Sequence, residues 1–238
     1  MKIYGHRGYD AKYPENTLLS FKKAFEFGAD GIELDVRTTK DGKLIIFHDD
    51  DLKRIFGVEK DFDEVTFNEL RKYEFEGEKV PTFEEVLDVI PEDGLVIVEI
   101  KDRKAAGRAV CEILKRKMEE RAVFSSFDHE LIKELMRQFP EQDFAFLLGE
   151  EQKDFDAQKL LEELILHKPH SIHIPKDAFD IFGEKQVRSF LKFLKDEGIE
   201  IFLWNTNDVD FVKKHEDLID AVIVDEVEKF VETFKRLT

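Results

Sequence analysis

Short apolar runs rich in β-branched residues alternate with longer amphipathic stretches from one end of the chain to the other. This alternation is typical of repeated βα units, whose strands lie parallel in one sheet. Nine runs have the length and composition of buried strands: 3–6, 31–35, 44–48, 95–100, 123–126, 144–148, 171–174, 201–204 and 221–224. A closed eight-stranded barrel needs one strand fewer than this pattern supplies.

The segment between the second and third runs removes the surplus. Asp41-Gly42 between two apolar runs is a strong hairpin signal, and the connection is too short for a parallel crossover. The run 44–48 is therefore expected to return antiparallel, as the arm of a hairpin that stands above the barrel. With a two-residue turn at this dipeptide, Asp35 faces His48 across the ladder.

The other runs then form the parallel strands of an α/β fold, a TIM (β/α)8 barrel with a short hairpin and a small excursion over its C-terminal mouth. The excursion, residues 51–94, is longer than one βα connection, and capping-box patterns at Thr66 and Thr82 begin two short helices within it. Because no linker or low-complexity tract divides the chain, we expect residues 1–238 to form one domain that contains this small insertion.

The charge of the chain excludes one class of partner. The formal net charge is −17, from 54 acidic and 37 basic residues. Such a field repels nucleic acids and anionic lipid head groups, so we expect no nucleic acid as a partner. A small anion still binds where cations gather locally, because charges beyond about 8 Å are largely screened. A site for such a ligand must supply its own positive charge.

The cysteine content and the hydropathy of the sequence indicate the cellular compartment in which the protein is expected. Cys111 is the only cysteine and cannot form an internal disulfide, so the sequence gives no support to an oxidising compartment. No window approaches the roughly 18 apolar residues of a membrane span, and no apolar leader precedes the first strand. We therefore expect a cytoplasmic protein without stable membrane insertion, while the oligomeric state stays open.

Acidic side chains gather at the C-terminal ends of two predicted strands. Side chains alternate along a strand, so Glu33 and Asp35 share one face of the second run. Glu99 and Lys101 share a face of the fourth run in the same way. In a barrel, charged residues at the C-terminal ends of inward-facing rows line the mouth where active sites lie.

Three carboxylates that converge there repel one another unless a cation lies between them. Ligation by oxygen alone suits Mg²⁺, Ca²⁺ or Mn²⁺ better than zinc, so one such divalent cation is the predicted cofactor. An alternative stays open, in which Glu33 and Glu99 only form ion pairs with Arg7 and Lys101.

Two histidines flank this predicted metal site. His6 ends the first strand, and the hairpin returns His48 to the same level. Cleavage of a phosphodiester needs a base for the nucleophile and an acid for the leaving alkoxide, and imidazole serves either role. A structural role for either histidine is the competing interpretation.

With these residues in this order, the chain resembles the glycerophosphodiester phosphodiesterase family. The matching segments follow the family's order and cover nearly the whole chain, which makes the set specific. They are His6-Arg7-Gly8, Pro14-Glu15-Asn16-Thr17, Gly31-Ile32-Glu33-Leu34-Asp35-Val36, Thr39-Lys40-Asp41-Gly42, His48-Asp49, Pro81-Thr82, Glu99-Ile100-Lys101, Ser126-Phe127 and Trp204.

The resemblance implies a TIM-type barrel in which His6 and His48 act as acid and base, in an order that stays open. It also implies that the three carboxylates bind one divalent ion and that Arg7 and Lys101 hold the phosphate. Trp204, at the end of a strand, is expected either to pack against the glycerol backbone or to cap the barrel.

The chain departs from the family pattern near its C-terminus. Residues 204–207 read Trp-Asn-Thr-Asn in place of Trp-Thr-Val-Asn, and residues 224–227 read Val-Asp-Glu-Val in place of Thr-Asp-x-Pro. We expect these changes to affect substrate fit rather than chemistry.

The remaining histidines are expected to be less important. His173 lies in a predicted strand and is a candidate for an inward-facing residue that contacts substrate. His129, His167, His170 and His215 lie in polar or helix-end contexts and are expected at the surface.

The reaction that the resemblance implies is metal-dependent hydrolysis of a small glycerophosphodiester to glycerol 3-phosphate and an alcohol. Attack by the substrate's own 2-hydroxyl and direct attack by water both stay open, as does the identity of the alcohol. A lysophospholipase D-like activity is the alternative within enzymes, with the Phe-bearing segment 56–83 as an apolar entrance. A catalytically silent barrel that binds a phosphodiester or a protein is the alternative outside enzymes.

Overall fold

Eight parallel strands close into a barrel in the computed structural model, which describes residues 1–149 and 157–235. The sheet order is β1-β9-β8-β7-β6-β5-β4-β2-β3, and β1 also pairs with β2, which closes the ring. The predicted TIM barrel is thus confirmed. The strands are β1 (Lys2–Gly5), β2 (Gly31–Thr38), β3 (Leu44–Ile46), β4 (Leu95–Ile100), β5 (Ala122–Ser126), β6 (Asp143–Leu147), β7 (Ser171–Pro175), β8 (Glu200–Trp204) and β9 (Ala221–Val224).

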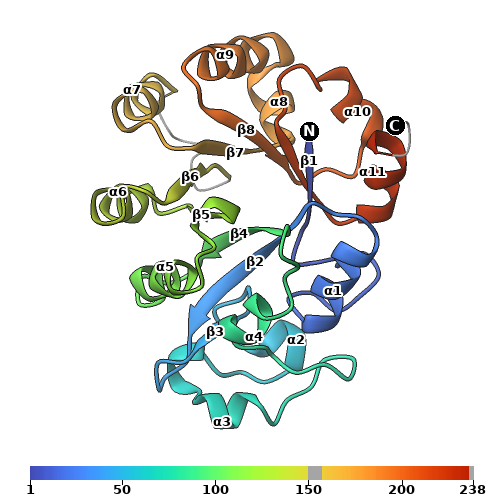
Figure 1. Ribbon diagram of the computed structural model, residues 1–238, viewed down its shortest axis with the longest axis vertical. Helices are drawn as coiled ribbons and strands as arrows, with labels where there is room; N and C mark the ends of the chain where they lie inside the picture. The colour runs from blue at the N-terminus through green and yellow to red at the C-terminus, as the bar shows by residue number, and fades with distance from the viewer. Residues whose placement is uncertain (150–156, 236–238) are drawn as a thin grey trace.

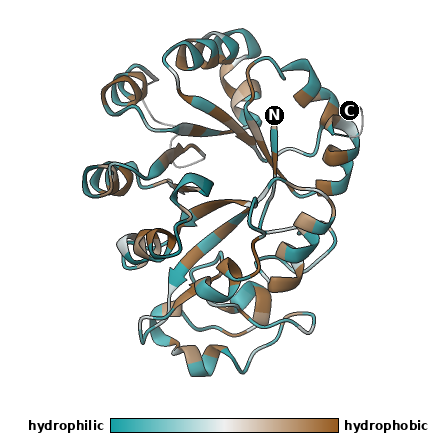
Figure 2. Cartoon of the chain, viewed as in Figure 1, coloured by the Kyte–Doolittle hydropathy of each residue, from teal (hydrophilic) through white to brown (hydrophobic). Residues whose placement is uncertain are grey.

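Helices surround the strands in chain order (Figure 1). They alternate with the strands, as the right-handed βα crossover requires. Apolar segments are concentrated on the strands, while the helices also carry hydrophilic stretches (Figure 2). The helices of this ring are α1 (Leu18–Glu26), α5 (Ala106–Lys115), α6 (His129–Gln138), α7 (Ala157–His167), α8 (Asp177–Phe182), α9 (Glu184–Asp196), α10 (Val209–Lys214) and α11 (Val227–Phe234), with a 3-10 turn η2 (Glu119–Arg121) before β5.

The alternation of β2 decides what lines the barrel interior. Ile32 and Leu34 belong to the large core between strands and helices. Glu33 lies beside Ile97 of β4, which packs inside the barrel with Tyr4 and Phe202. The barrel interior is therefore apolar at mid-height and becomes acidic toward the C-terminal ends of the strands.

The hairpin forms as predicted, but its predicted register is wrong by one residue. β3 pairs antiparallel with β2, with Val36 opposite Ile46. The Phe47 amide donates to the Asp35 carbonyl at 2.9 Å. Phe47 and not His48 therefore lies opposite Asp35, and His48 follows one residue beyond the ladder.

The side chain of Thr39 explains the shift. Its hydroxyl donates to Asp41 Oδ1 at 2.7 Å, and its oxygen accepts from the Lys43 amide at 3.0 Å. The Lys43 carbonyl accepts from the Thr39 amide, so the turn contains three residues, and Gly42 takes a left-handed φ of +79°. A three-residue loop with glycine in this conformation is the next most common hairpin after the two-residue form.

The excursion packs beside the hairpin (Figure 1, cyan to green). It contains α2 (Lys53–Phe56), a 3-10 turn η1 (Phe62–Glu64), α3 (Phe67–Leu70) and α4 (Phe83–Leu87). Both predicted capping boxes are present, at Thr66 and Thr82. Its apolar residues form a second, smaller core with Ile45 and Phe47 of the hairpin arm.

Two histidines expected at the surface are buried instead. His129 stacks on Phe146 and its Nε2 lies 3.0 Å from the Leu147 carbonyl. His215 is fully buried against Phe179 and Phe211. Both histidines have polar neighbours in the sequence, so their burial was not predicted. Phe146 and Phe179, which help to cover them, come from other elements of the chain.

Over the part of the chain that the structure describes, no helix has the length and apolar character needed to cross a bilayer.

His170 gives the fold a measurable pH dependence at the N-terminal end of the barrel. Its ring lies 3.3 Å from Asp143 Oδ1 and 3.4 Å from Glu200 Oε2. These two partners raise the pKa of His170 to about 9, although burial acts in the opposite direction. Because the unfolded value is about 6.5, the stabilisation is complete below about pH 6.5 and is lost as the pH rises through about 9.

We therefore expect His170→Asn to lower the free energy of unfolding by about 1 kcal/mol at about pH 6, a magnitude reduced by the partial exposure of all three side chains. The difference from the wild type should be nearly zero at about pH 10, where His170 is neutral in both states. Urea denaturation of the wild type and of His170→Asn, from about pH 6 to about pH 10, measures this difference in the free energy of unfolding. A difference that stays constant with pH would contradict the ion-pair interpretation.

Candidate active site

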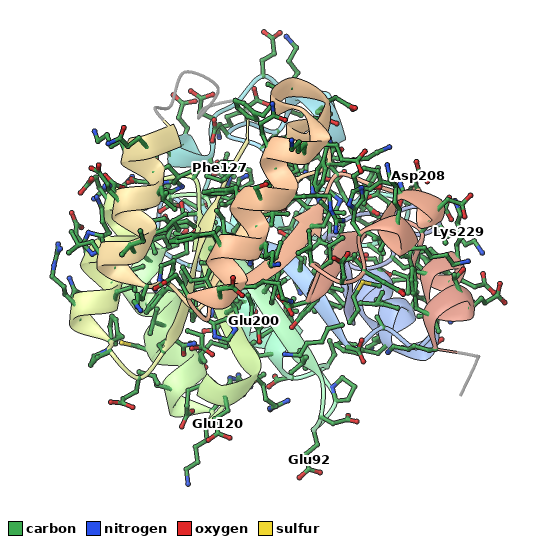
Figure 3. All side chains as sticks on the ribbon, turned by 90° about the horizontal axis from the view of Figure 1, so that it is seen from above. Glu92, Glu120, Phe127, Glu200, Asp208 and Lys229 are labelled. Atoms are coloured by element: carbon green, nitrogen blue, oxygen red, sulfur yellow. The ribbon has the colours of Figure 1, made fainter. Side chains whose placement is uncertain are left out.

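The candidate site lies at the C-terminal ends of the strands. Phe127 and Asp208 follow β5 and β8 and lie at one end of the barrel, whereas Glu92 and Glu120 precede β4 and β5 and lie at the other (Figure 3). The predicted site residues come from the first of these ends. Seven of them line a single cavity of about 120 Å³: His6, Arg7, Glu33, His48, Glu99, Lys101 and Trp204.

Glu33, Asp35 and Glu99 converge as predicted. One carboxylate oxygen from each lies within 4.8 Å of the others. All three side chains are buried, and Asp35 is only 1% exposed. Register explains the convergence, because Asp35 and Glu99 are direct neighbours in the β2–β4 ladder.

Two cations partly balance these carboxylates. Lys101 Nζ lies 2.6 Å from Glu99 Oε1 and 3.7 Å from Asp35 Oδ1. Arg7 Nε lies 3.4 Å from Asp35 Oδ2. Burial opposes ionisation of Asp35, yet Lys101 and Arg7 hold its pKa below the usual range. Burial and then the charge of Asp35 raise the pKa of Glu33, so the cluster lacks enough positive charge to ionise fully.

The donor set fits a hard divalent cation. Asp35 Oδ1 is buried and, within the described residues, accepts no hydrogen bond. An uncompensated carboxylate oxygen is costly in a protein interior. Three carboxylates and no nitrogen or sulfur ligand suit Mg²⁺, Ca²⁺ or Mn²⁺. Lys101 Nζ lies 3.7 Å from this oxygen, so ion pairing reaches it, but no described residue donates a hydrogen bond to it. The two interpretations from the sequence are therefore compatible.

The turn after β1 places Arg7 over the cluster. Arg7 has a left-handed φ of +48°, and its amide donates to Glu33 Oε2 at 3.0 Å. Its carbonyl accepts from the Ser20 hydroxyl at 2.8 Å. Gly8 follows with φ +90°, and a Cβ there would clash with Ser20 Oγ. Backbone geometry thus requires glycine at position 8, while Arg7 adopts a left-handed conformation that is unfavourable for an arginine.

His48 is held by a chain of ion pairs that starts in the excursion. Its Nδ1 lies 2.7 Å from Asp49 Oδ1. Arg54 of α2 contacts Asp49 Oδ2 at 2.6 Å and Glu15 Oε1 at 2.7 Å. Glu15 in turn pairs with Arg7 at 2.9 Å. The sequence did not predict this role of Glu15, because its partner Arg54 lies 39 residues away.

His6 is held from the opposite side of the barrel mouth. Its Nδ1 lies 2.8 Å from Asp225 Oδ1 and 3.1 Å from Asp10 Oδ2. Sequence reasoning missed both aspartates and assigned the segment around Asp225 to substrate fit. The available signal was positional, since Asp225 directly follows β9 and β9 pairs with β1 in a closed barrel.

Aromatic residues complete the cavity. Trp204 meets Phe127 edge-on at 6.2 Å between ring centroids, and its indole nitrogen is buried without a hydrogen bond to any described residue. His173 faces inward, as expected, and stacks on Phe202 at 4.8 Å. Burial lowers the pKa of His173 to about 3, so its ring is neutral.

An open groove of about 900 Å³ continues from the cavity toward the excursion. His48, Glu99 and Lys101 border both. Charged side chains form most of the groove wall, among them Arg37, Asp49, Asp50, Lys53, Arg54 and Asp128. The groove thus offers a polar path to the candidate site.

A TIM barrel with buried carboxylates, an arginine, a lysine and two histidines at its mouth is suited to the hydrolysis of a phosphodiester. Residues 6–229 match the model of the Glycerophosphoryl diester phosphodiesterase family. The chain therefore belongs to this family, as its resemblance indicated.

Similar proteins of known name support the assignment of the chain to this family. A glycerophosphodiester phosphodiesterase of Caldanaerobacter subterraneus subsp. tengcongensis is 29% identical, with 98% of each chain covered. The crystal structure of the Thermotoga maritima glycerophosphodiester phosphodiesterase is 40% identical, covers 97% of each chain and has a TM-score of 0.86. An Oleispira antarctica phosphodiesterase solved with the product sn-glycerol-3-phosphate has a TM-score of 0.83, covers 98% of this chain and 96% of its own, and at 24% identity shows the fold alone.

The carboxylate cluster predicts a cation-dependent stability. Adding Mg²⁺, Mn²⁺ or Ca²⁺ to metal-stripped protein should raise its melting temperature, because a ligand that binds only the native state stabilises it by about 2.7 kcal/mol at 100 times its Kd. Glu33→Gln should lose this increase while melting no lower than the wild type without metal, since it replaces a carboxyl group whose ionisation is opposed by burial and by Asp35. Glu92→Gln, at the opposite end of the barrel, serves as the control and should respond like the wild type. An undiminished increase in Glu33→Gln would exclude Glu33 as a ligand.

Proposed function

We propose that the chain hydrolyses glycerophosphodiesters to glycerol 3-phosphate and an alcohol. The observation that carries this proposal is the shared cavity, in which two histidines and two cations face the same cluster of carboxylates. Membership of the family supports the substrate class. The site residues are His6 and His48 for proton transfer, with Arg7 and Lys101 for the phosphate.

Charge decides how the phosphate is held. Arg7 and Lys101 lie within ion-pair distance of Asp35, so their charges are already oriented at the bottom of the cavity. Glu33, Asp35 and Glu99 would hold one divalent cation, which when bound neutralises negative charge on phosphoryl oxygens. The side chains on the cavity wall then stabilise charge that develops on the phosphoryl group.

Hydrogen bonding suggests which histidine is the acid. A carboxylate only accepts, so Nδ1 carries the proton in both rings. His48 has one such partner, and burial lowers its pKa, which leaves Nε2 as an unprotonated base. His6 lies between two carboxylates, which raise its pKa well above 6.5 although burial opposes them. His6 therefore holds a proton on both nitrogens and is the proposed acid for the leaving alkoxide.

The lysophospholipase D-like alternative has less support. Phe56, Phe62 and Phe67 of segment 56–83 pack in the small core beside the hairpin, and Phe83 is buried in the large core of the barrel. The groove that leads to the site is bordered mostly by charged side chains, which are unfavourable for an acyl chain. A silent barrel is also disfavoured, since every residue that the chemistry needs is present.

We further propose that residues 1–238 act as one domain and that the protein works in the cytoplasm. The excursion shares Ile45 and Phe47 with the hairpin, so its small core depends on the barrel. The lone cysteine, Cys111, supports a reducing compartment.

An assay of three substrates tests the proposed function. Glycerophosphocholine and glycerophosphoethanolamine should release glycerol 3-phosphate, EDTA should abolish this activity, and Mg²⁺, Mn²⁺ or Ca²⁺ should restore it. A lysophospholipid should react far more slowly. Full activity in metal-stripped protein would refute the cation requirement, and faster turnover of the lysophospholipid would favour the alternative.

The proposed roles of the two histidines predict a bell-shaped pH dependence of kcat/KM. Activity should fall on the acidic side as His48, whose pKa lies below 6.5, becomes protonated, and on the alkaline side as His6, whose pKa lies above 6.5, loses its proton. Asp49→Asn removes a group that favours protonated His48 and should move only the acidic limb, to lower pH. Movement of the alkaline limb instead would reverse the two roles.

A further inference from the structure

Asp225 and Asn207 form a hydrogen-bonded corner where β8 and β9 end next to β1. Asp225 Oδ1 accepts from His6 Nδ1 at 2.8 Å. Asp225 Oδ2 accepts from Asn207 Nδ2 at 2.9 Å, and Asn207 Oδ1 accepts from the Asp225 amide at 3.2 Å. We infer that Asp225, clamped by Asn207, is a positioning residue that fixes the ring orientation and tautomer of His6. This inference rests on the proposed function, in which His6 transfers a proton.

The clamp holds Asp225 at both its side chain and its backbone. Besides the Asp225 amide, Asn207 Oδ1 accepts from the Glu226 amide at 3.2 Å. The Asn207 carbonyl accepts from Lys229 Nζ of α11 at 2.7 Å. Asp208 and Lys229 lie near each other on the outer side of this corner (Figure 3). Loops after two different strands are thereby locked together, which fixes the carboxylate relative to the barrel.

Two carboxylates approach His6 Nδ1, but only one is held in place. Asp10 is farther away, at 3.1 Å, and its Oδ1 is buried without a hydrogen-bond partner in the described chain. Burial raises the pKa of Asp10. Against the effect of burial, hydrogen bonds from His6 and Asn207 lower the pKa of Asp225 to about 2. Asp225 is thus the ionised, immobilised partner, and Asp10 is the weaker one.

Fixing Nδ1 determines what His6 offers to a substrate. An imidazole can rotate and exchange tautomers, so a free ring spends only part of its time with Nε2 directed into the cavity. A carboxylate on Nδ1 keeps the proton there and leaves Nε2 as the only ring nitrogen for chemistry, as in carboxylate–histidine pairs generally. His6 lines the cavity together with Arg7 and Glu33, so proton transfer at its Nε2 would take place beside the carboxylate cluster.

A double-mutant cycle in the full-length, metal-loaded enzyme tests this role, with glycerophosphocholine as the substrate. Asp225→Asn should lower kcat by about 10- to 100-fold, part of the roughly 10²- to 10⁴-fold that a positioned acid or base contributes. KM should stay within about threefold, because no phosphate contact is lost. In a His6→Ala background, Asp225→Asn should have almost no further effect, since it acts only through His6.

Matched variants separate positioning from folding. Asp220→Asn changes the aspartate at the opposite end of β9, where it binds Lys195, and should leave kcat unchanged. Asn207→Ala should lower kcat in the same direction as Asp225→Asn, and Asp10→Asn should lower it less. Melting temperatures of all variants identify any general loss of structure.

Two outcomes overturn the inference: wild-type kcat in Asp225→Asn, or an equal loss from Asp225→Asn with and without His6. Nitrogen NMR of the His6 ring gives a test that does not depend on turnover. At a pH above the pKa of His6, where the ring is neutral, Nδ1 should be protonated in the wild type, and Asp225→Asn should produce a mixture of tautomers. If the wild type hydrolyses no glycerophosphodiester, the proposed function fails, while an unchanged ring spectrum in Asp225→Asn refutes the positioning role independently.

Discussion

The crowding of three buried carboxylates at the barrel mouth is the constraint on which the rest of the site depends. Glu33, Asp35 and Glu99 cannot all be charged within 4.8 Å without compensation. The left-handed turn at Arg7 directs an amide and a guanidinium toward them. Lys101 approaches from the next strand. The same unbalanced charge that calls for a cation also orients the groups that would bind a phosphate.

The two histidines are held by different parts of the molecule. His6 depends on the barrel itself, through loops that follow β8 and β9. His48 depends on the hairpin and on Arg54 of the excursion. The proposed acid and the proposed base therefore have different surroundings: two carboxylates approach His6, whereas His48 is desolvated beside cations. Because the surroundings differ, one fold can hold two histidines in opposite protonation states near neutral pH.

Local patterns were sufficient to predict the barrel and the central residues of the site. Strand alternation fixes the face of Glu33 and Asp35 without knowledge of any partner. The hairpin register failed because one hydroxyl, that of Thr39, changes a two-residue turn into a three-residue turn. Asp225 was missed for another reason, since its role arises only when the last strand meets the first. The sequence carries only a positional signal for such an interaction, and that signal can be used only once the closure of the barrel is taken into account.

The link between His6 and Asp225 spans 219 residues, which has a consequence for biosynthesis. During translation β1 emerges early, but the His6 ring that follows it has no carboxylate from the end of β9 until that strand has been made and docked. Before β9 is made, Asp10 is the only one of its two described carboxylate partners that has been synthesised. In the proposed mechanism, a fully positioned acid is therefore acquired only when the ring of strands closes.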